Sequence, residues 1–211
     1  MSTITSKLQL TVPSLEDEVH QTIQDLANNF QKIDTLAENY AHDFPTSGYY
    51  RLGNKVWNNN PQSGNYVGWV NTREGQAAPV WKTLTTYVVG DYVFPMNNNG
   101  HYYECIQAGR SGVTEPSFST VAGDIISDTR NGETWKASRL YQLNDIVFPF
   151  VDNNRFYVCA TSGVSASTEP SWSLTDGGIT SDGSVIWKGY RITKWQTKGT
   201  SCHFKPFGKI E

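Results

Sequence analysis

The chain has 211 residues, of which 37% are hydrophobic and 13% aromatic, and its net charge is −3. That length can bury a sizeable core, but the slightly acidic balance gives no electrostatic basis for nucleic-acid binding. The sequence contains no apolar run long enough to cross a bilayer and no secretory leader, so we expect neither membrane insertion nor signal-directed export.

Residues 1–13 are interpreted as an N-terminal extension, because MSTITSKLQLTV contains a stretch that alternates polar and apolar residues. Alternation is typical of a strand, and an extended segment can add to the sheet of a neighbouring protein. We therefore predict that this end attaches the chain to a partner.

Residues 14–44 predict a helix that serves in oligomerisation. The sequence has no Gly or Pro from Ser14 to Asp43, Ser14 can act as the N-cap, and Pro45 and Gly48 end the helix. Apolar residues alternate at spacings of four and three, which is the a/d pattern of a coiled coil. These residues are Val19, Ile23, Leu26, Phe30, Ile33, Ala37 and Tyr40.

Two interpretations of this helix remain open. It could be an amphipathic helix that lies on the chain's own globular part, or it could be the seam of an oligomeric coiled coil. Ile and Phe at the a positions, with Leu, Ile and Val at d, are compatible with three strands. Our prediction is a homotrimer.

The rest of the chain predicts tandem small antiparallel β modules, so the expected fold class is mainly β. A constant offset of 54 residues places Trp81 on Trp135, Tyr87 on Tyr141 and Asp91 on Asp145. The repeats are predicted to span 81–134 and 135–188, with Trp135 closing the first as Trp187 closes the second. A degraded copy, YRLGNKVW, begins at Tyr50.

Alternation within each repeat predicts which side chains form its core. A hairpin turn is expected at Asn99-Gly100, and in the strand that follows, Tyr103 and Cys105 point to one face. Their counterparts in the second repeat are Tyr157 and Cys159. We expect these pairs and the flanking tryptophans to fill two very small cores.

The sequence shows no pattern of catalytic, metal-binding or cofactor-binding residues. Three cysteines are an odd number, and Cys105 and Cys159 hold equivalent places in different repeats, so we expect no disulfide framework. The chain has no Cys-x-x-Cys or His pair at ligand spacing. Glu115 and Glu169 fall in separate repeats, so they do not predict a glycosidase pair. The repeated aspartates are typical of turns. We expect no enzyme activity, no cofactor and no metal.

The motif Trp-x5-Tyr-x2-Gly-Asp-x-Val, an Asn-Gly turn, Tyr-x-Cys, AGRSGVTEP and a closing Asp-to-Trp segment resembles a small β module of bacteriophage tail fibres, tail spikes and head fibres. The resemblance covers residues 81–187. It extends distantly to the chitin-binding modules of bacterial chitinases, whose additional Trp-Trp pair for the sugar is missing here.

The flanks resemble a second element of phage fibre and spike proteins, a compact capping element. It is carried by GYYRLGNKVWNNNPQSGNYVGWV and by GTSCHFKPFGKIE. The resemblance implies that residues 48–80 and 190–211 form one discontinuous domain, into which the repeats are inserted.

Together the resemblances imply a structural component of a bacteriophage virion (tail fibre, collar or head fibre/spike). We expect it to have no catalytic activity, to dock on other virion proteins through its N-terminal segment and to contact host surface glycans. The alternative is a carbohydrate-binding accessory module of a secreted or surface protein. Candidate sugar contacts are Tyr102, Phe118, Phe156 and Trp172. For Phe118 and Trp172, which occupy the same position after Thr-Glu-Pro, the alternative is a structural role as lids on the cores.

Overall fold

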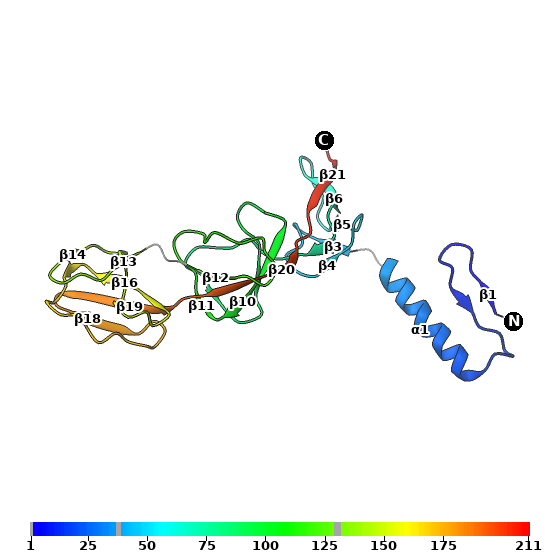
Figure 1. The fold of residues 1–211 in the computed structure, drawn as a ribbon. Coiled ribbons are helices and arrows are strands. Elements are labelled where there is room, and N and C mark those ends of the chain that lie inside the picture. Colours follow the sequence, from blue (N-terminus) through cyan, green and yellow to red (C-terminus); the bar gives the residue numbers. More distant parts are fainter. Residues whose placement is uncertain (1, 37–38, 129–131) are drawn as a thin grey trace. The chain divides into compact units, whose positions relative to one another are not determined.

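A computed structural model describes residues 2–36, 39–128 and 132–211 (Figure 1). As the sequence predicts, the fold is mainly β, with one helix and several small, mostly antiparallel sheets. The chain divides into two compact units. Unit 1 contains Met1–Phe44, Lys55–Val70 and Pro206–Glu211, and unit 2 contains Pro45–Asn54 and Asn71–Lys205.

The N-terminal extension of unit 1 pairs with itself. Strands β1 (Thr3–Ile4) and β2 (Thr11–Val12) form an antiparallel hairpin. The side chain of Asn29, on the helix, holds this hairpin: its carbonyl oxygen accepts from the Thr11 N–H at 2.9 Å, and its amide donates to the Thr11 carbonyl at 2.7 Å. The alternating segment is therefore already paired within the chain, which differs from a free strand awaiting a partner.

Helix α1 (Val19–Leu36) is shorter than the predicted 14–44. Ser14 does not cap it. The Asp17 carboxylate instead accepts the Ser14 N–H at 2.7 Å, which closes a turn, and the first helical bond runs from the Thr22 N–H to the Glu18 carbonyl. Hydrogen bonds from Ser2 and Ser14 hold the pKa of Asp17 below its ordinary value.

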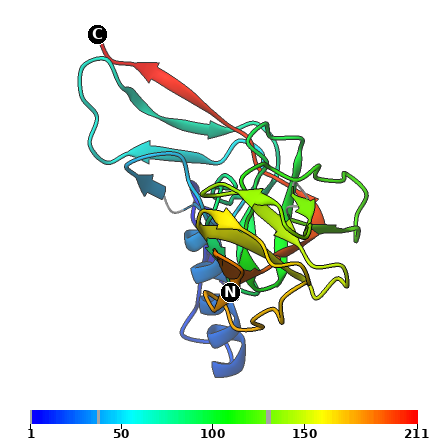
Figure 2. The same cartoon turned by 90° about the vertical axis from the view of Figure 1, so that its left-hand side faces the viewer.

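The rest of unit 1 is sheet. Strand β3 (Asn39–Ala41) runs parallel to β5 (Lys55–Asn58), and β5 is antiparallel to β6 (Tyr66–Asn71). Strand β21 (Phe204–Lys209), red in Figure 2, completes the order β21-β6-β5-β3. Tyr40 lies in β3, so its assignment to the helical seam is wrong, and Ala37 lies outside the described residues.

Unit 2 contains a module, here called module 2 (residues 132–191), that includes the second predicted repeat, 135–188. Its five-stranded sheet has the order β13-β15-β16-β19-β18, and β14 pairs with β17. The strands are β13 (Glu133–Thr134), β14 (Leu140–Tyr141), β15 (Ile146–Phe148), β16 (Arg155–Thr161), β17 (Gly163–Val164), β18 (Ile179–Asp182) and β19 (Val185–Arg191).

Module 1 (residues 77–128 and 193–200) is split by module 2. Its sheet has the order β12-β20-β10-β9, and β8 pairs with β11. The strands are β8 (Thr86–Tyr87), β9 (Tyr92–Val93), β10 (His101–Gln107), β11 (Gly109–Arg110), β12 (Ile125–Ser127) and β20 (Lys194–Thr200). Because β20 pairs with both β10 and β12, the first repeat ends after the second one, not at residue 134.

The closing tryptophan of module 1 is Trp195, so the assignment of Trp135 to that place is wrong. The indole N–H groups of Trp81 and Trp195 both donate to Oδ2 of Asp128, at 2.8 Å each. In module 2 the two indoles on Asp182 belong to Trp135 and Trp187, at 2.7 and 2.9 Å. Trp135 therefore opens module 2 and takes no part in module 1.

A third copy, called the partial module (residues 45–54, 71–76 and 201–205), surrounds module 1 in the same way. Strand β4 (Tyr49–Tyr50) pairs with β7 (Gly75–Gln76), and the Gln76 carbonyl accepts from the Cys202 N–H at 3.0 Å. The C-terminal segment that rejoins this copy therefore starts at residue 201; the predicted segment, 190–211, includes residues 194–200, which belong to module 1.

One ring pair marks the same position in all three copies. A tyrosine meets the ring of the returning chain edge to face, with centroids 5.0, 4.8 and 4.8 Å apart. The pairs are Tyr50 with Phe204, Tyr87 with Trp195 and Tyr141 with Trp187. Each copy is therefore closed by a strand that returns after the next copy has been completed, except in module 2, where the chain returns at once.

Glycines occur where the returning chain passes. A Cβ added to Gly109 would lie 2.4 Å from the Arg191 carbonyl oxygen, and one added to Gly75 would lie 2.3 Å from that of Thr200. Gly163 is in the same contact with Ser184 in module 2. A side chain at these positions would hold the returning strand away from the core.

Candidate functional site

The aromatic residues predicted to contact sugars have different positions in the structure. Phe156 is fully buried and packs on Tyr190 with ring centroids 5.7 Å apart, so it is not a surface contact. Its counterpart Tyr102 is half-buried and lies edge to face with Tyr92 at 5.3 Å. Burial raises the pKa of the Tyr102 hydroxyl.

Phe118 and Trp172 cover the two cores as lids. Phe118 lies 4.3 Å from Tyr103 between ring centroids, and Trp172 lies 4.2 Å from Tyr157. The Trp172 indole donates to Glu169 at 2.8 Å. Both rings are half-buried, and their packing supports the structural interpretation.

The two cores contain the side chains that alternation predicts. Tyr103 and Cys105 are 0% exposed, and their counterparts in module 2 are equally buried. The three cysteines are free thiols, all buried. Burial raises the pKa of Cys105 and of Cys202 to about 11 each, so both stay protonated and unreactive at neutral pH.

The repeated acids bind backbone and indole groups. Asp91 accepts the Val88 N–H at 2.8 Å, which is the turn role expected of it. Glu169 accepts the Phe150 N–H at 2.8 Å, and Glu115 makes the same contact with Met96. Asp128 was also expected to be a turn acid, and its role as the acceptor for two indoles was not predicted.

The apolar face of α1 is exposed. The exposed fractions of its seam residues lie between 43% and 76%. They are 76% for Val19, 62% for Ile23, 43% for Leu26, 68% for Phe30 and 44% for Ile33. The hairpin β1–β2 covers another stripe of the helix, where Asp25 and Asn29 are buried and Lys32 donates to the Gln9 carbonyl at 2.6 Å.

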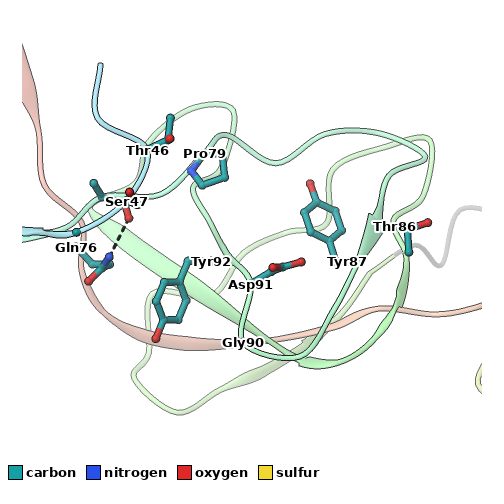
Figure 3. Close-up of a pocket in the computed structure, with 11 residues that line it drawn as sticks. Thr46, Ser47, Gln76, Pro79, Thr86, Tyr87, Gly90, Asp91 and Tyr92 are labelled. Atoms are coloured by element: carbon teal, nitrogen blue, oxygen red, sulfur yellow. Dashed lines mark hydrogen bonds between the residues drawn. The ribbon is translucent and has the colours of Figure 1, made fainter. Parts of the chain in front are cut away.

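A groove of about 500 Å³ lies within unit 2, between the partial module and module 1 (Figure 3). The partial module contributes residues 46–48 and the end of β7, and module 1 contributes Pro79 and the turn between β8 and β9. The Ala77 N–H donates to the Gly48 carbonyl at 2.7 Å, which joins the two sides of the groove.

Side chains of the β8–β9 turn determine the chemistry of this groove. Tyr92 is 36% exposed, and Figure 3 shows its ring lining one end while Asp91 lies between it and Tyr87. Tyr87 is buried, its hydroxyl accepts the Lys82 N–H at 2.9 Å, and burial raises its pKa. The aromatic wall of the groove is thus held in place by the core of module 1.

The sequence repeat did not single out this groove, because it compares copies position by position. The sequence indicates the groove only through a difference between the copies, because Tyr92 of module 1 corresponds to Ile146 of module 2. The other side of the groove comes from Thr46 and Ser47, which lie at the start of the partial module and have no repeated counterpart that we predicted.

Two further findings concern the described residues. In the part of the chain that the structure describes, no three His, Cys, Asp or Glu side chains cluster as they would around a metal ion. Across those same residues, no helix is both long and apolar enough to span a membrane.

Comparison of the chain with protein-family models, curated proteins and solved structures found no match.

Proposed function

We propose that the protein is a structural component of a bacteriophage virion, a tail-fibre, collar, head-fibre or spike protein that self-associates through α1 and contacts host surface glycans with its modules. It would do so without catalysis. The observation that carries this proposal is the exposed a/d face of α1, because an apolar stripe of five large exposed side chains is stabilised when other chains cover it.

The N-terminal hairpin supports self-association in a particular orientation. It covers the side of the helix that carries Asp25 and Asn29, so the chain uses its own residues to bury a polar stripe and leaves the apolar one open. Copies of α1 would then pack with their seams inward and their hairpins outside. We propose a trimer, because β-branched Ile at position a and at position d is compatible with three strands.

The modules suit the other half of the proposal. Each has a small core fixed by two indoles on one buried carboxylate, so a module presents its surface rigidly. Three copies of a weak binding surface held together would bind a cell surface far more tightly than one copy does.

Light scattering tests the oligomer. We expect a solution mass of about three times the 23.6 kDa of one chain. The substitutions Ile23→Asp and Phe30→Asp together should give a monomer, whereas Gln24→Asp, on the exposed polar side of α1, should leave the mass unchanged. A monomeric wild-type protein would refute self-association.

Localisation tests the virion assignment. Antibody labelling of purified particles of the encoding phage, viewed by electron microscopy, should place the protein at the particle surface in multiples of three. Deleting residues 1–13 should release it from particles if the hairpin is the docking element. Particles that lack the protein would contradict the assignment.

A second candidate, a carbohydrate-binding accessory module of a secreted or surface protein, is favoured by the groove beside Tyr92. It predicts binding to an insoluble polysaccharide by a monomer, without any particle. Light scattering and particle labelling therefore separate the two candidates.

A further inference from the structure

The groove between the partial module and module 1 has a composition that selects a class of ligand. Its side chains combine one exposed aromatic ring with hydroxyl, amide and carboxylate groups. They are Thr46, Ser47, Gln76, Thr86, Asp91 and Tyr92. The lining contains no Lys or Arg, so the groove offers no partner for a phosphate or another anion.

The Tyr92 ring is held as a platform. Tyr102 meets it edge to face at 5.3 Å with an interplanar angle of 79°, and strand β9, which carries Tyr92, pairs with β10. The ring is 36% exposed, so it can still be covered by a ligand. A fixed ring with an open face binds apolar C–H surfaces at little cost in side-chain entropy.

Asp91 places an acceptor beside this platform. One carboxylate oxygen accepts the Val88 N–H at 2.8 Å, which orients the group. Its other oxygen accepts no hydrogen bond from the residues that the structure describes, so it can receive hydroxyl donors from a ligand. A ligand with C–H faces and many hydroxyls fits both features, and an anionic ligand would be repelled.

We propose that this groove binds a short segment of a neutral saccharide, with a sugar face on Tyr92 and hydroxyls on Asp91. The inference deepens the glycan contact in the proposed function and rests on it for its biological context. It also moves that contact from Phe118 and Trp172, which cover the cores, to the β8–β9 turn of module 1.

Other copies of the repeat provide substitutions that the fold already tolerates. Module 2 has Ile146 where module 1 has Tyr92, and the partial module has Asn54 where module 1 has Asp91. The Asn54 carbonyl oxygen accepts the Arg51 N–H at 2.6 Å, the same turn contact that Asp91 makes. Tyr92→Ile and Asp91→Asn should therefore change the groove and leave the fold intact.

Saturation-transfer difference NMR and calorimetry on the full-length protein test the proposal. The probes are neutral tetrasaccharides of glucose (cellotetraose and maltotetraose) and of N-acetylglucosamine, with a sulfated heparin tetrasaccharide as the anionic comparison. We expect at least one neutral probe to bind, and the heparin probe not to bind. Tyr92→Ile should weaken binding about tenfold and Asp91→Asn about threefold.

Asp145→Asn is the matched control, because it makes the same change in module 2, next to Ile146, and should leave affinity unchanged. Unaltered thermal unfolding would show that the variants are folded. The proposal is overturned if no neutral probe binds at about 20 mM, if heparin binds better, or if folded Tyr92→Ile binds as the wild type does.

This outcome is separable from that of the virion proposal. Free sugars and soluble protein are used, so sugar binding can succeed for a chain that is absent from particles. Equally, a chain found on particles can fail to bind any of these sugars.

Discussion

Modules 1 and 2 have matching cores but complete them by different routes. In module 2 the chain turns at Gly183 and Ser184 from β18 directly into β19, so the closing Trp187 is five residues after Asp182. In module 1 the chain leaves after Asp128, builds all of module 2, and only then returns as β20 with Trp195. A module is thus defined by where the chain returns in space.

The exit point explains why such an interruption is tolerated. Asp128 and Trp195 form one hydrogen-bonded closure. Strands β12 and β20, on either side of the interruption, are antiparallel neighbours with adjacent ends. An inserted domain whose own ends lie close together can replace the turn with little change elsewhere. The partial module, which receives module 1, repeats the arrangement.

The substitution Trp195→Ala should produce the largest effect. Trp195 is 0% exposed and meets Tyr87 and Asp128, so removing it should destabilise module 1 by about 3–5 kcal/mol. Amide hydrogen exchange should rise in β10, although β10 precedes residue 195 by about ninety positions in the chain. Exchange in β16 of module 2 should change little.

Trp135→Ala and Trp187→Ala are the matched controls for this prediction. Both tryptophans donate to Asp182, so both variants should raise exchange in β16 and spare β10. If Trp135→Ala exposes β10 while Trp195→Ala does not, the repeats are tandem and the nested arrangement is wrong.

A somewhat smaller loss is expected from Asp128→Ala. The Asp128 carboxylate accepts the indole N–H groups of Trp81 and Trp195 and, through its other oxygen, the Gly112 N–H at 2.9 Å. Three buried donors would lose this acceptor, so we expect a loss of about 3 kcal/mol in the free energy of unfolding by urea.

Asp128→Asn refines that measurement, and Asp182→Ala repeats it in module 2. The amide keeps one acceptor oxygen but turns an N–H₂ group toward a donor, so its cost should lie between those of wild type and alanine. Equal stability of wild type and Asp128→Ala would mean that the tryptophans do not depend on this carboxylate.

The sequence repeat located most of both cores and misplaced one closure. Period-two alternation correctly buried Tyr103, Cys105 and their counterparts, because the pleat sends alternate side chains to one face. It misassigned Trp135 because the offset was read in chain order. That residue already matched Trp81 at the constant offset of 54, and one indole cannot serve two cores.

Other differences have local causes. Ser14 has the composition of an N-cap, but Asp17 closes a turn on its N–H, so the helix begins five residues later. Phe156 was expected at the surface because it alternates with Tyr157, yet Tyr190 of the neighbouring strand covers it. The groove requires residues from two copies, and no periodicity within a copy can indicate that.

Alkaline pH should lower the stability of both modules, by less than the substitutions above. Burial raises the pKa of Cys105 from an ordinary value of 9.0 to about 11, and it raises that of Cys159 as well. The folded state therefore holds these protons more tightly than the unfolded state. This contribution to stability is complete below pH 9 and is lost as pH rises toward 11.

Urea unfolding at pH 7 and pH 10 tests this sign. The loss of stability between the two pH values should be smaller in Cys105→Ala than in the wild type. The corresponding effect of Cys159→Ala should appear in β16 of module 2 rather than in β10 of module 1. Buried tyrosines such as Tyr87 and Tyr103 titrate in the same direction, so the difference between variant and wild type is the informative quantity. An identical pH dependence would contradict the buried-thiol argument.

Excision of module 2 is the largest change in sequence considered, but it should have the smallest effect on module 1. One glycine in place of residues 129–191 would give Asp128-Gly-Ile192-Thr193-Lys194-Trp195, which reproduces the five-residue spacing from Asp182 to Trp187. Gly183 of module 2 has φ of 59°, so glycine suits the new turn. Replacing a domain-sized loop by a tight turn also lowers the entropic cost of closing the loop.

We therefore expect β10 to keep its hydrogen-exchange protection to within about 1 kcal/mol after the excision, and residues 132–191 to fold as a separate fragment. Glycine in place of residues 129–193 would shorten the turn by two residues and should break the closure, because Trp195 could no longer reach Asp128. Loss of β10 protection with the correctly spaced turn would mean that the stability of module 1 depends on module 2. The copies would then form one cooperative structure.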